Sequence, residues 1–220
     1  MRAANRLYTV QILLLAFAAG CNNVLDVHPI NEVDESQAIT TPAGARAAVA
    51  GLYDALQGGS TDPGATQNIS YYGGELLFFG DLSADDVEHT GTFTTYRQMD
   101  QNDITSDNLS IEGFWDAIYR AVGRANIVIE KVPDVPGFTD PAERDDLLAQ
   151  AYFIRALSFH NLVKVFGDTA PTGLGVPLVL VPPKNISEAG LATRATTCEV
   201  YAQILSDLSE AETRIGSATD

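Results

Sequence analysis

The chain has 220 residues, of which 45% are apolar and 19% are charged. A chain of this size and composition can bury a core of its own, and it is too apolar to be disordered throughout. The 29 acidic residues outnumber the 13 basic ones, and the formal charge of −16 argues against nucleic acid as a partner, because phosphate binding needs a basic face.

Residues 1–20 have the pattern of a bacterial lipoprotein signal peptide. Arg2 and Arg6 precede an apolar stretch at 10–19, which is about half the length that a membrane span needs. Small residues ending in Gly-Cys follow, as in the lipoprotein cleavage box, and the cysteine is Cys21. An ordinary secreted protein with a chance cysteine at this place is the alternative.

The signal peptide predicts a lipidated N-terminus. Cleavage would leave Cys21 as an acylated (palmitate-type) first residue, and residues 21–40 would form a tether from the lipid to the folded body. Loss of the two arginines changes the formal charge from −16 to −18. We therefore expect a chain that is anchored to a membrane without crossing it.

The first helix is predicted at residues 42–57. Thr41-Pro42 supplies an N-cap followed by a proline at the first helical position, and Gly58-Gly59 ends the segment. Apolar residues recur at helical spacing at Ala48, Val49, Leu52, Tyr53 and Leu56.

Residues 58–109 show no clear periodicity, which predicts a long functional loop or disorder. The acids in this segment are Asp81, Asp85, Asp86, Glu88, Asp100, Asp103 and Asp107. The run from Asp100 lacks the glycine and glutamate of a calcium-binding EF-hand loop, so we expect no metal. A solvated acidic surface is favoured over an acid-based hydrolase that uses Asp85.

The same segment holds the candidate ligand-binding residues Tyr96, Arg97, Gln98 and Asn102. A flat aromatic ring can stack on the apolar face of a sugar, while amide and charged groups bind its hydroxyls. The alternative is that the aromatic rings of this segment pack beneath the loop.

Two long helices follow. The first is predicted at 111–132 with Ser110 as its cap, because a continuous apolar face runs along it. The second is predicted from Asp140 to 166, where Glu143 could complete a capping box. Its second half is apolar on almost every side and should be central, so the buried Arg155 within it requires a structural partner.

Residues 168–195 are predicted to form a surface loop with a short extended piece at 176–181. A last helix begins at Thr196 or Thr197, where Thr196 and Glu199 have capping-box spacing. Cys198 is expected to be a small buried residue of this helix. The predicted apolar face consists of Val200, Tyr201, Ile204, Leu205, Leu208 and Ala211.

These elements predict an all-α fold with paired long helices and long irregular loops. The short connection near residues 133–139 makes its flanking helices antiparallel neighbours, which is compatible with tetratricopeptide-like helix hairpins. No strict repeat is visible. The expected domain covers residues 41–220.

The chain resembles the SusD/RagB-like outer-membrane lipoproteins. The resemblance is carried in order by Cys21 to Asp26, by Trp115, Tyr119 and Asn126, by Ala151 to Leu157, by Phe166 to Asp168, and by Arg194 and Glu199 to Ala211. It implies a non-enzymatic protein without a cofactor that binds oligosaccharides, or sometimes peptides, and delivers them to a SusC-like TonB-dependent transporter.

Members of this family are usually more than twice as long, so the resemblance implies that the chain corresponds to the N-terminal part of such a protein. The apolar face of the last helix would then be partly exposed. Only the segment from Tyr96 to Asn102 is expected to contribute to a ligand site. A helical scaffold that binds its partner and no ligand is the alternative.

Overall fold

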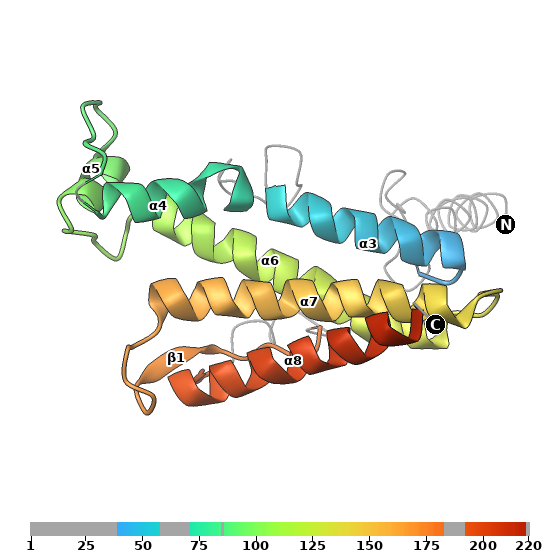
Figure 1. Cartoon of the computed structure of the whole chain (residues 1–220). Coiled ribbons are helices and arrows are strands. Elements are labelled where there is room, and N and C mark those ends of the chain that lie inside the picture. The colour runs from blue at the N-terminus through green and yellow to red at the C-terminus, as the bar shows by residue number, and fades with distance from the viewer. Residues whose placement is uncertain (1–38, 58–70, 85, 183–191, 219–220) are drawn as a thin grey trace, which may run out of the picture. The chain divides into compact units, whose positions relative to one another are not determined.

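A computed structural model describes residues 39–57, 71–84, 86–182 and 192–218 (Figure 1). The expected signal peptide at 1–20, the lipidation site Cys21, nearly all of the tether and Asp85 lie outside the described residues.

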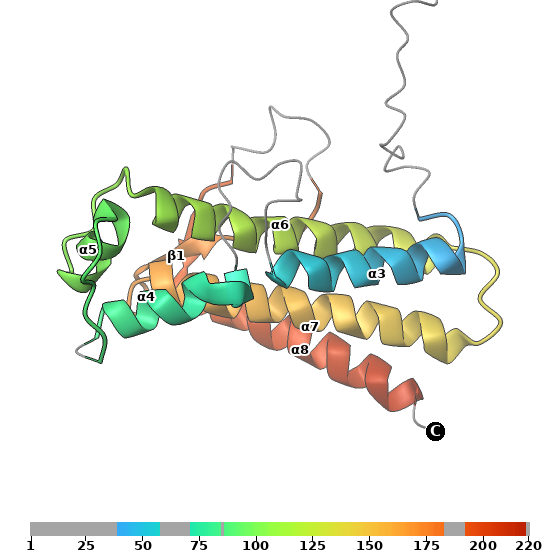
Figure 2. The same cartoon turned by 90° about the horizontal axis from the view of Figure 1, so that it is seen from above.

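Four long helices form the body of the fold, as the sequence predicts. They are α3 (Pro42–Gln57), α6 (Leu109–Lys131), α7 (Pro141–Phe166) and α8 (Thr197–Ala218). Helix α7 packs against α6 and α8, and α3 packs against both α6 and α7 (Figures 1 and 2). The all-α expectation is confirmed, with α7 at the centre. None of the described helices is both long and apolar enough to cross a membrane.

Three of these helices begin at the side-chain caps that the sequence predicts. The Thr41 hydroxyl accepts a hydrogen bond from the Gly44 backbone N–H at 3.1 Å, which caps α3. Thr196 and Glu199 form the predicted reciprocal pair at the start of α8, because the Glu199 carboxylate accepts from the Thr196 N–H at 2.8 Å and the Thr196 hydroxyl accepts from the Glu199 N–H at 3.3 Å. Asp140 caps α7 as predicted.

Two details of capping differ from the sequence prediction. Helix α6 is capped by Asn108 rather than Ser110, because the Asn108 side-chain oxygen accepts from the N–H groups of Ser110 and Ile111. Glu143 does not complete a capping box at α7. Its carboxylate instead forms an ion pair with Arg46 of α3, which lies alongside.

The segment predicted as a long loop contains short helices, so that prediction was wrong in part. A distorted helical turn at Tyr71–Glu75 leads into α4 (Leu76–Leu82), and α5 follows at Thr94–Asp100. Each of α4 and α5 is seven residues long and buries a single residue, Leu82 or Met99. An element this short cannot show the helical period that reveals the longer helices.

The core forms two clusters along α7. One cluster fills the space between α3, α6 and the first half of α7, and the other lies between α6, the second half of α7, the first turns of α8 and residue Tyr71. The fully buried large side chains of the second cluster include Tyr71, Phe114, Ile118, Phe159 and Leu162.

Arg155 has the structural partner that its burial requires. Its guanidinium donates to both carboxylate oxygens of Asp207, at 2.8 and 2.7 Å. It also donates to the side-chain oxygen of Asn126 at 2.8 Å and to the Leu180 carbonyl at 3.4 Å. One buried side chain therefore joins α7 to α8, to α6 and to the connection between α7 and α8.

The connection between α7 and α8 is held by side chains of α6. It contains β1 (Leu174–Pro177), which pairs antiparallel with β2 (Arg194–Thr196). At the end of β1 and just after it the backbone is bonded to α6, since Tyr119 donates to the Pro177 carbonyl and Asn126 donates to the Val179 carbonyl, both at 2.8 Å. The predicted extended piece therefore exists, although its strand begins two residues earlier than expected.

Only part of the predicted apolar face of α8 is buried. Val200, Ile204 and Ala211 pack toward the body, whereas Leu205 is 67% exposed. Other exposed apolar residues of α8 are Tyr201, Leu208 and Ile215. The expectation of a partly exposed face is confirmed. Cys198 lies in the first turn of α8 and is exposed, so the prediction that it is buried was wrong.

We predict that Asp207→Asn lowers the free energy of unfolding by about 3 kcal/mol or more, because it leaves the buried guanidinium of Arg155 without a compensating charge. Urea denaturation followed by circular dichroism measures the change. The control is Glu143→Gln, which breaks the exposed ion pair with Arg46 and should change the stability far less. Similar losses in the two variants would contradict the structural role assigned to Arg155.

Candidate functional site

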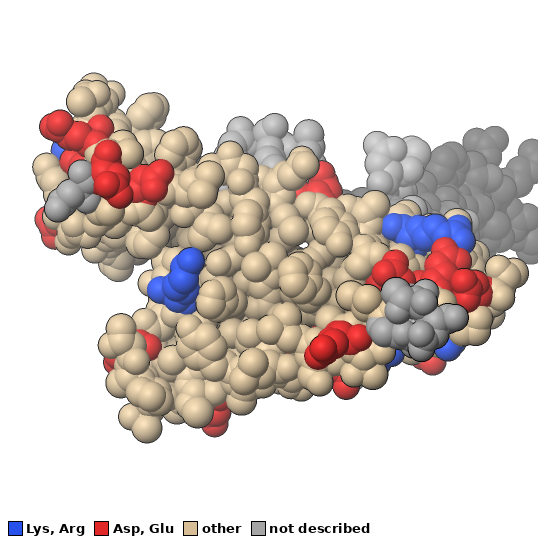
Figure 3. Space-filling view, viewed as in Figure 1, with Lys and Arg blue, Asp and Glu red and all other residues tan. Residues whose placement is uncertain are grey.

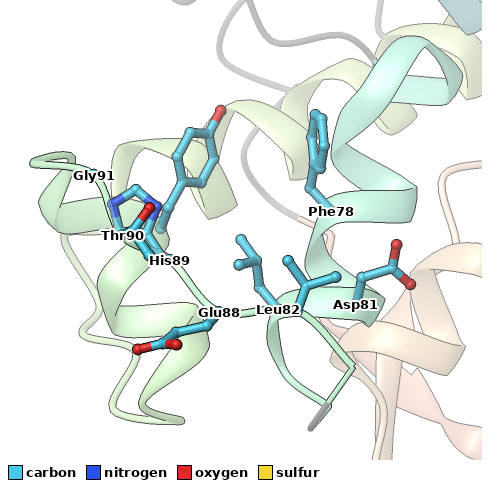
Figure 4. A pocket seen from close by; sticks show the side chains of 9 residues that line it. Phe78, Asp81, Leu82, Glu88, His89, Thr90 and Gly91 are labelled. Atoms are coloured by element: carbon cyan, nitrogen blue, oxygen red, sulfur yellow. The ribbon is translucent and has the colours of Figure 1, made fainter.

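A hollow of about 310 Å³ lies between α4 and the segment that leads into α5. Figure 4 shows Phe78 and Asp81 projecting from α4, with His89 and Thr90 across from them. The residues that line it are Phe78, Asp81, Leu82, Val87, Glu88, His89, Thr90, Gly91 and Tyr96. The hollow thus combines apolar, aromatic and acidic side chains.

Aromatic rings surround Tyr96. The ring centre of Tyr96 lies 6.4 Å from that of Phe78, 5.9 Å from that of His89 and 6.0 Å from that of Phe93. Phe78 is 54% exposed and Phe93 is 67% exposed, so these two rings do not pack beneath the segment. Tyr71 does, since it is fully buried in the core. The rings near Tyr96 are therefore accessible to a ligand.

The hydroxyl of Tyr96 is fixed by a buried carboxylate. It donates to Oε1 of Glu75 at 3.2 Å, and Glu75 itself is buried. Burial raises the pKa of Glu75, an effect that the hydrogen bond from Tyr96 partly offsets. Burial also raises the pKa of Tyr96, with a further contribution from the neighbouring Glu75. The second oxygen of Glu75 has no hydrogen-bond partner among the described residues.

Gln98, one of the residues predicted to bind a ligand, is engaged within the fold. Its Nε2 donates to the Thr105 hydroxyl at 2.9 Å, and its Oε1 accepts from Nδ2 of Asn108 at 2.6 Å. Asn108 also donates to the Thr95 carbonyl at 3.0 Å. These bonds brace α5 against the start of α6, so Gln98 helps to position the hollow.

Arg97 and Asn102 lie on the same helix and turn as Tyr96, but neither lines the hollow. Arg97 is exposed and donates to the Thr94 hydroxyl at 3.1 Å. Asn102 adopts a left-handed backbone conformation with φ of 51°, and its side chain donates to the Ser83 carbonyl at 3.4 Å. Asn102 therefore ends α5 and links it to the end of α4. Of the four predicted residues, only Tyr96 lines the hollow.

His89 belongs to the site and was not identified from the sequence, where it had no partner at metal-ligand spacing. Its imidazole lies against Gly91, because a Cβ atom at that position would be 2.9 Å from Cε1 of His89. Nε2 of His89 has no hydrogen-bond partner among the described residues. The short interval between His89 and the glycine is the only signal of this contact in the sequence.

Acidic residues gather at this end of the molecule (Figure 3). The described residues between 71 and 108 include Glu75, Asp81, Asp86, Glu88, Asp100, Asp103 and Asp107. Arg97 is the one Lys or Arg residue among them. Within the part of the chain that the structure describes, no group of three or more His, Cys, Asp or Glu side chains is arranged to hold a metal ion.

Comparison with known proteins relates this chain to one family. Residues 64–219 match the SusD-like family described as starch-binding associating with outer membrane. The chain is 28% identical over 206 residues to SusD-like protein P38 of Formosa agariphila, an alignment that covers 91% of this chain and 35% of that protein. The chain thus spans about a third of the length of the curated relatives that it matches.

Solved structures show the same fold. A SusD superfamily protein from Bacteroides thetaiotaomicron superimposes with a TM-score of 0.63 at 26% identity, over 79% of this chain and 37% of that one. A laminarin-binding SusD-like protein superimposes with a TM-score of 0.62, also at 26% identity, over 80% of this chain and 34% of that one.

We predict that Glu75 makes the stability of the protein depend on pH. Because its folded-state pKa is raised above the ordinary value of 4.5, its contribution is fully present below about pH 4.5 and is lost as the pH rises through the folded-state pKa. Glu75→Gln should therefore gain stability relative to the wild type between pH 4 and pH 7. Urea denaturation across this range measures the difference.

The matched control for this experiment is Glu88→Gln, which removes an exposed carboxylate from the same hollow. Its stability should follow that of the wild type across the range. A Glu75→Gln stability difference that stays constant from pH 4 to pH 7 would contradict the predicted effect of burial.

Proposed function

The chain belongs to the SusD-like family, and we propose that it binds glycans at the outer membrane for uptake. The observation that carries this proposal is the hollow around Tyr96, where accessible rings stand beside carboxylates. Sugars are recognised in this way, because their C–H faces pack on aromatic rings while their hydroxyls donate to acidic groups. The relative described as laminarin-binding supports the same class of ligand.

Tyr96 holds the central place in the proposed site. Its ring is near those of Phe78 and Phe93, and its hydroxyl donates a hydrogen bond to Glu75. A ring that is already fixed loses little conformational entropy when a sugar stacks on it. Asp81 and Glu88 would accept hydrogen bonds from sugar hydroxyls. These carboxylates would then orient the sugar, and stacking on the rings would supply most of the affinity.

In this proposal residues 1–20 are removed, Cys21 carries the lipid, residues 21–40 form the tether and residues 41–220 form a SusD-like N-terminal helical domain. The family description, which associates its members with the outer membrane, supports this location. The captured glycan is then delivered to a SusC-like TonB-dependent transporter. The chain acts by binding, without catalysis.

A second candidate function is a helical interaction protein that binds a membrane partner and no glycan. The exposed apolar residues of the long helices favour it, since such side chains are typical of protein contacts. These residues are Phe153, Tyr201, Leu205, Leu208 and Ile215. Glycan screening separates the two candidates, because this one predicts no binding to any sugar.

We predict that Tyr96→Ala weakens glycan binding about tenfold, because it removes the central stacking surface. The measurement is isothermal titration against the strongest ligand from a screen of laminari-, cello- and malto-oligosaccharides. Tyr96→Phe keeps the ring and should bind within about threefold of the wild type. The control is Tyr53→Ala, which removes an exposed tyrosine from α3. Unchanged binding by Tyr96→Ala would refute the assignment of the site.

We predict that Cys21→Ser releases the protein from the membrane fraction and abolishes incorporation of labelled palmitate in the native host. The chain offers a matched control, because Cys198 is its only other cysteine. Cys198→Ser should remain membrane-bound and labelled. Labelling that persists in Cys21→Ser would contradict lipidation at this residue.

A further inference from the structure

The charged groups at the hollow all have the same sign. Asp81 and Glu88 line it, and no Lys or Arg is among the lining residues that the structure describes. Arg97 follows Tyr96 directly in the sequence, but its guanidinium is exposed and bonded to the Thr94 hydroxyl. The nearest basic side chain along this segment is therefore not part of the hollow.

The aromatic rings, like the carboxylates, favour cationic ligands over anionic ones. The face of an aromatic ring carries partial negative charge, which attracts cations and disfavours anions. Tyr96 has the rings of Phe78 and Phe93 about 6 Å from its own, and both of these are more than half exposed. A ligand in this hollow meets aromatic rings, and the carboxylates of Asp81 and Glu88 lie at the edges of the hollow (Figure 4).

We propose that this hollow selects glycans by charge: it accepts uncharged and amine-bearing sugars and excludes those that carry carboxylate or sulfate groups. The inference rests on the proposed function, which it narrows to a class of ligand. A carboxylate on the sugar would sit near Asp81 and Glu88 without a counter-charge. An ammonium group would gain attraction from both carboxylates and from the rings.

The expected size of the effect follows from Coulomb's law. Two like charges a few ångströms apart near a protein surface repel enough to weaken binding tenfold or more, and the repulsion decreases as salt screens it. We therefore expect acidic glycans to bind at least tenfold more weakly than neutral ones in 20 mM salt. The ratio should shrink as the salt concentration rises to 0.5 M.

The first experiment is an array of neutral, amine-bearing, uronate and sulfated oligosaccharides, probed with the whole chain after residue 20. The expected result is binding to neutral or amine-bearing glycans. Binding mainly to uronate or sulfated glycans would overturn the charge inference while leaving the proposed function in place. Binding to no glycan would overturn the proposed function, and the inference with it.

The second experiment uses a matched pair of ligands: the best-bound uncharged oligosaccharide and the same backbone oxidised to a carboxylate at C6. Asp81→Asn/Glu88→Gln should bind the oxidised form about threefold to tenfold more tightly than the wild type does. Its affinity for the uncharged form should change much less. An unchanged ratio between the two ligands would refute the inference.

A control variant distinguishes the effect of the two carboxylates at the hollow from the effect of the protein's net charge. Asp134→Asn/Glu212→Gln removes the same two charges from exposed sites on η2 (Val132–Asp134) and α8. Helix α6 has 23 residues and is about 35 Å long. Helix α5 lies next to its first residue, whereas residue 134 follows its last residue. At 0.1 M salt, exposed charges more than about 10 Å apart are largely screened from one another, so this variant should discriminate against the oxidised ligand as the wild type does.

Discussion

The buried ion pair between Arg155 and Asp207 determines how the long helices fit together. A guanidinium in the middle of the central helix is costly to bury unless an opposite charge and hydrogen-bond acceptors surround it. Here the guanidinium donates to two carboxylate oxygens from α8, to the amide oxygen of Asn126 of α6 and to the Leu180 carbonyl. One side chain of α7 is thus bonded to α8, to α6 and to the connection between α7 and α8.

The candidate site depends on this framework through the first turn of α6. Asn108 caps α6 with its side-chain oxygen and donates from its nitrogen to Thr95 and Gln98 of α5. The short α5 would have little stability alone, because it buries only Met99. A rigid long helix therefore positions the short one, and with it the ring of Tyr96, opposite α4.

The sequence predicts the long helices because each repeats apolar residues over several turns and has a recognisable start. It also predicts that Arg155 is paired, since burial of an unpaired guanidinium is too costly. It does not reveal α4 and α5, which are too short to show a period. The hollow could be predicted only in part, because it forms where Phe78 and His89 from separate segments meet Tyr96. Gln98 and Asn102 have suitable chemistry for sugar binding, yet their side-chain bonds lie within the fold.

The most direct test is to follow the aromatic side-chain resonances by NMR while an oligosaccharide that the protein binds is added in steps. Shifts should be concentrated in the rings of Phe78, His89 and Tyr96, which line the hollow. The resonances of Trp115, which packs against Tyr119 and Phe166, should stay in place. Shifts at Trp115, with none at Tyr96, would contradict the claim that the acidic aromatic hollow is where this protein meets its ligand.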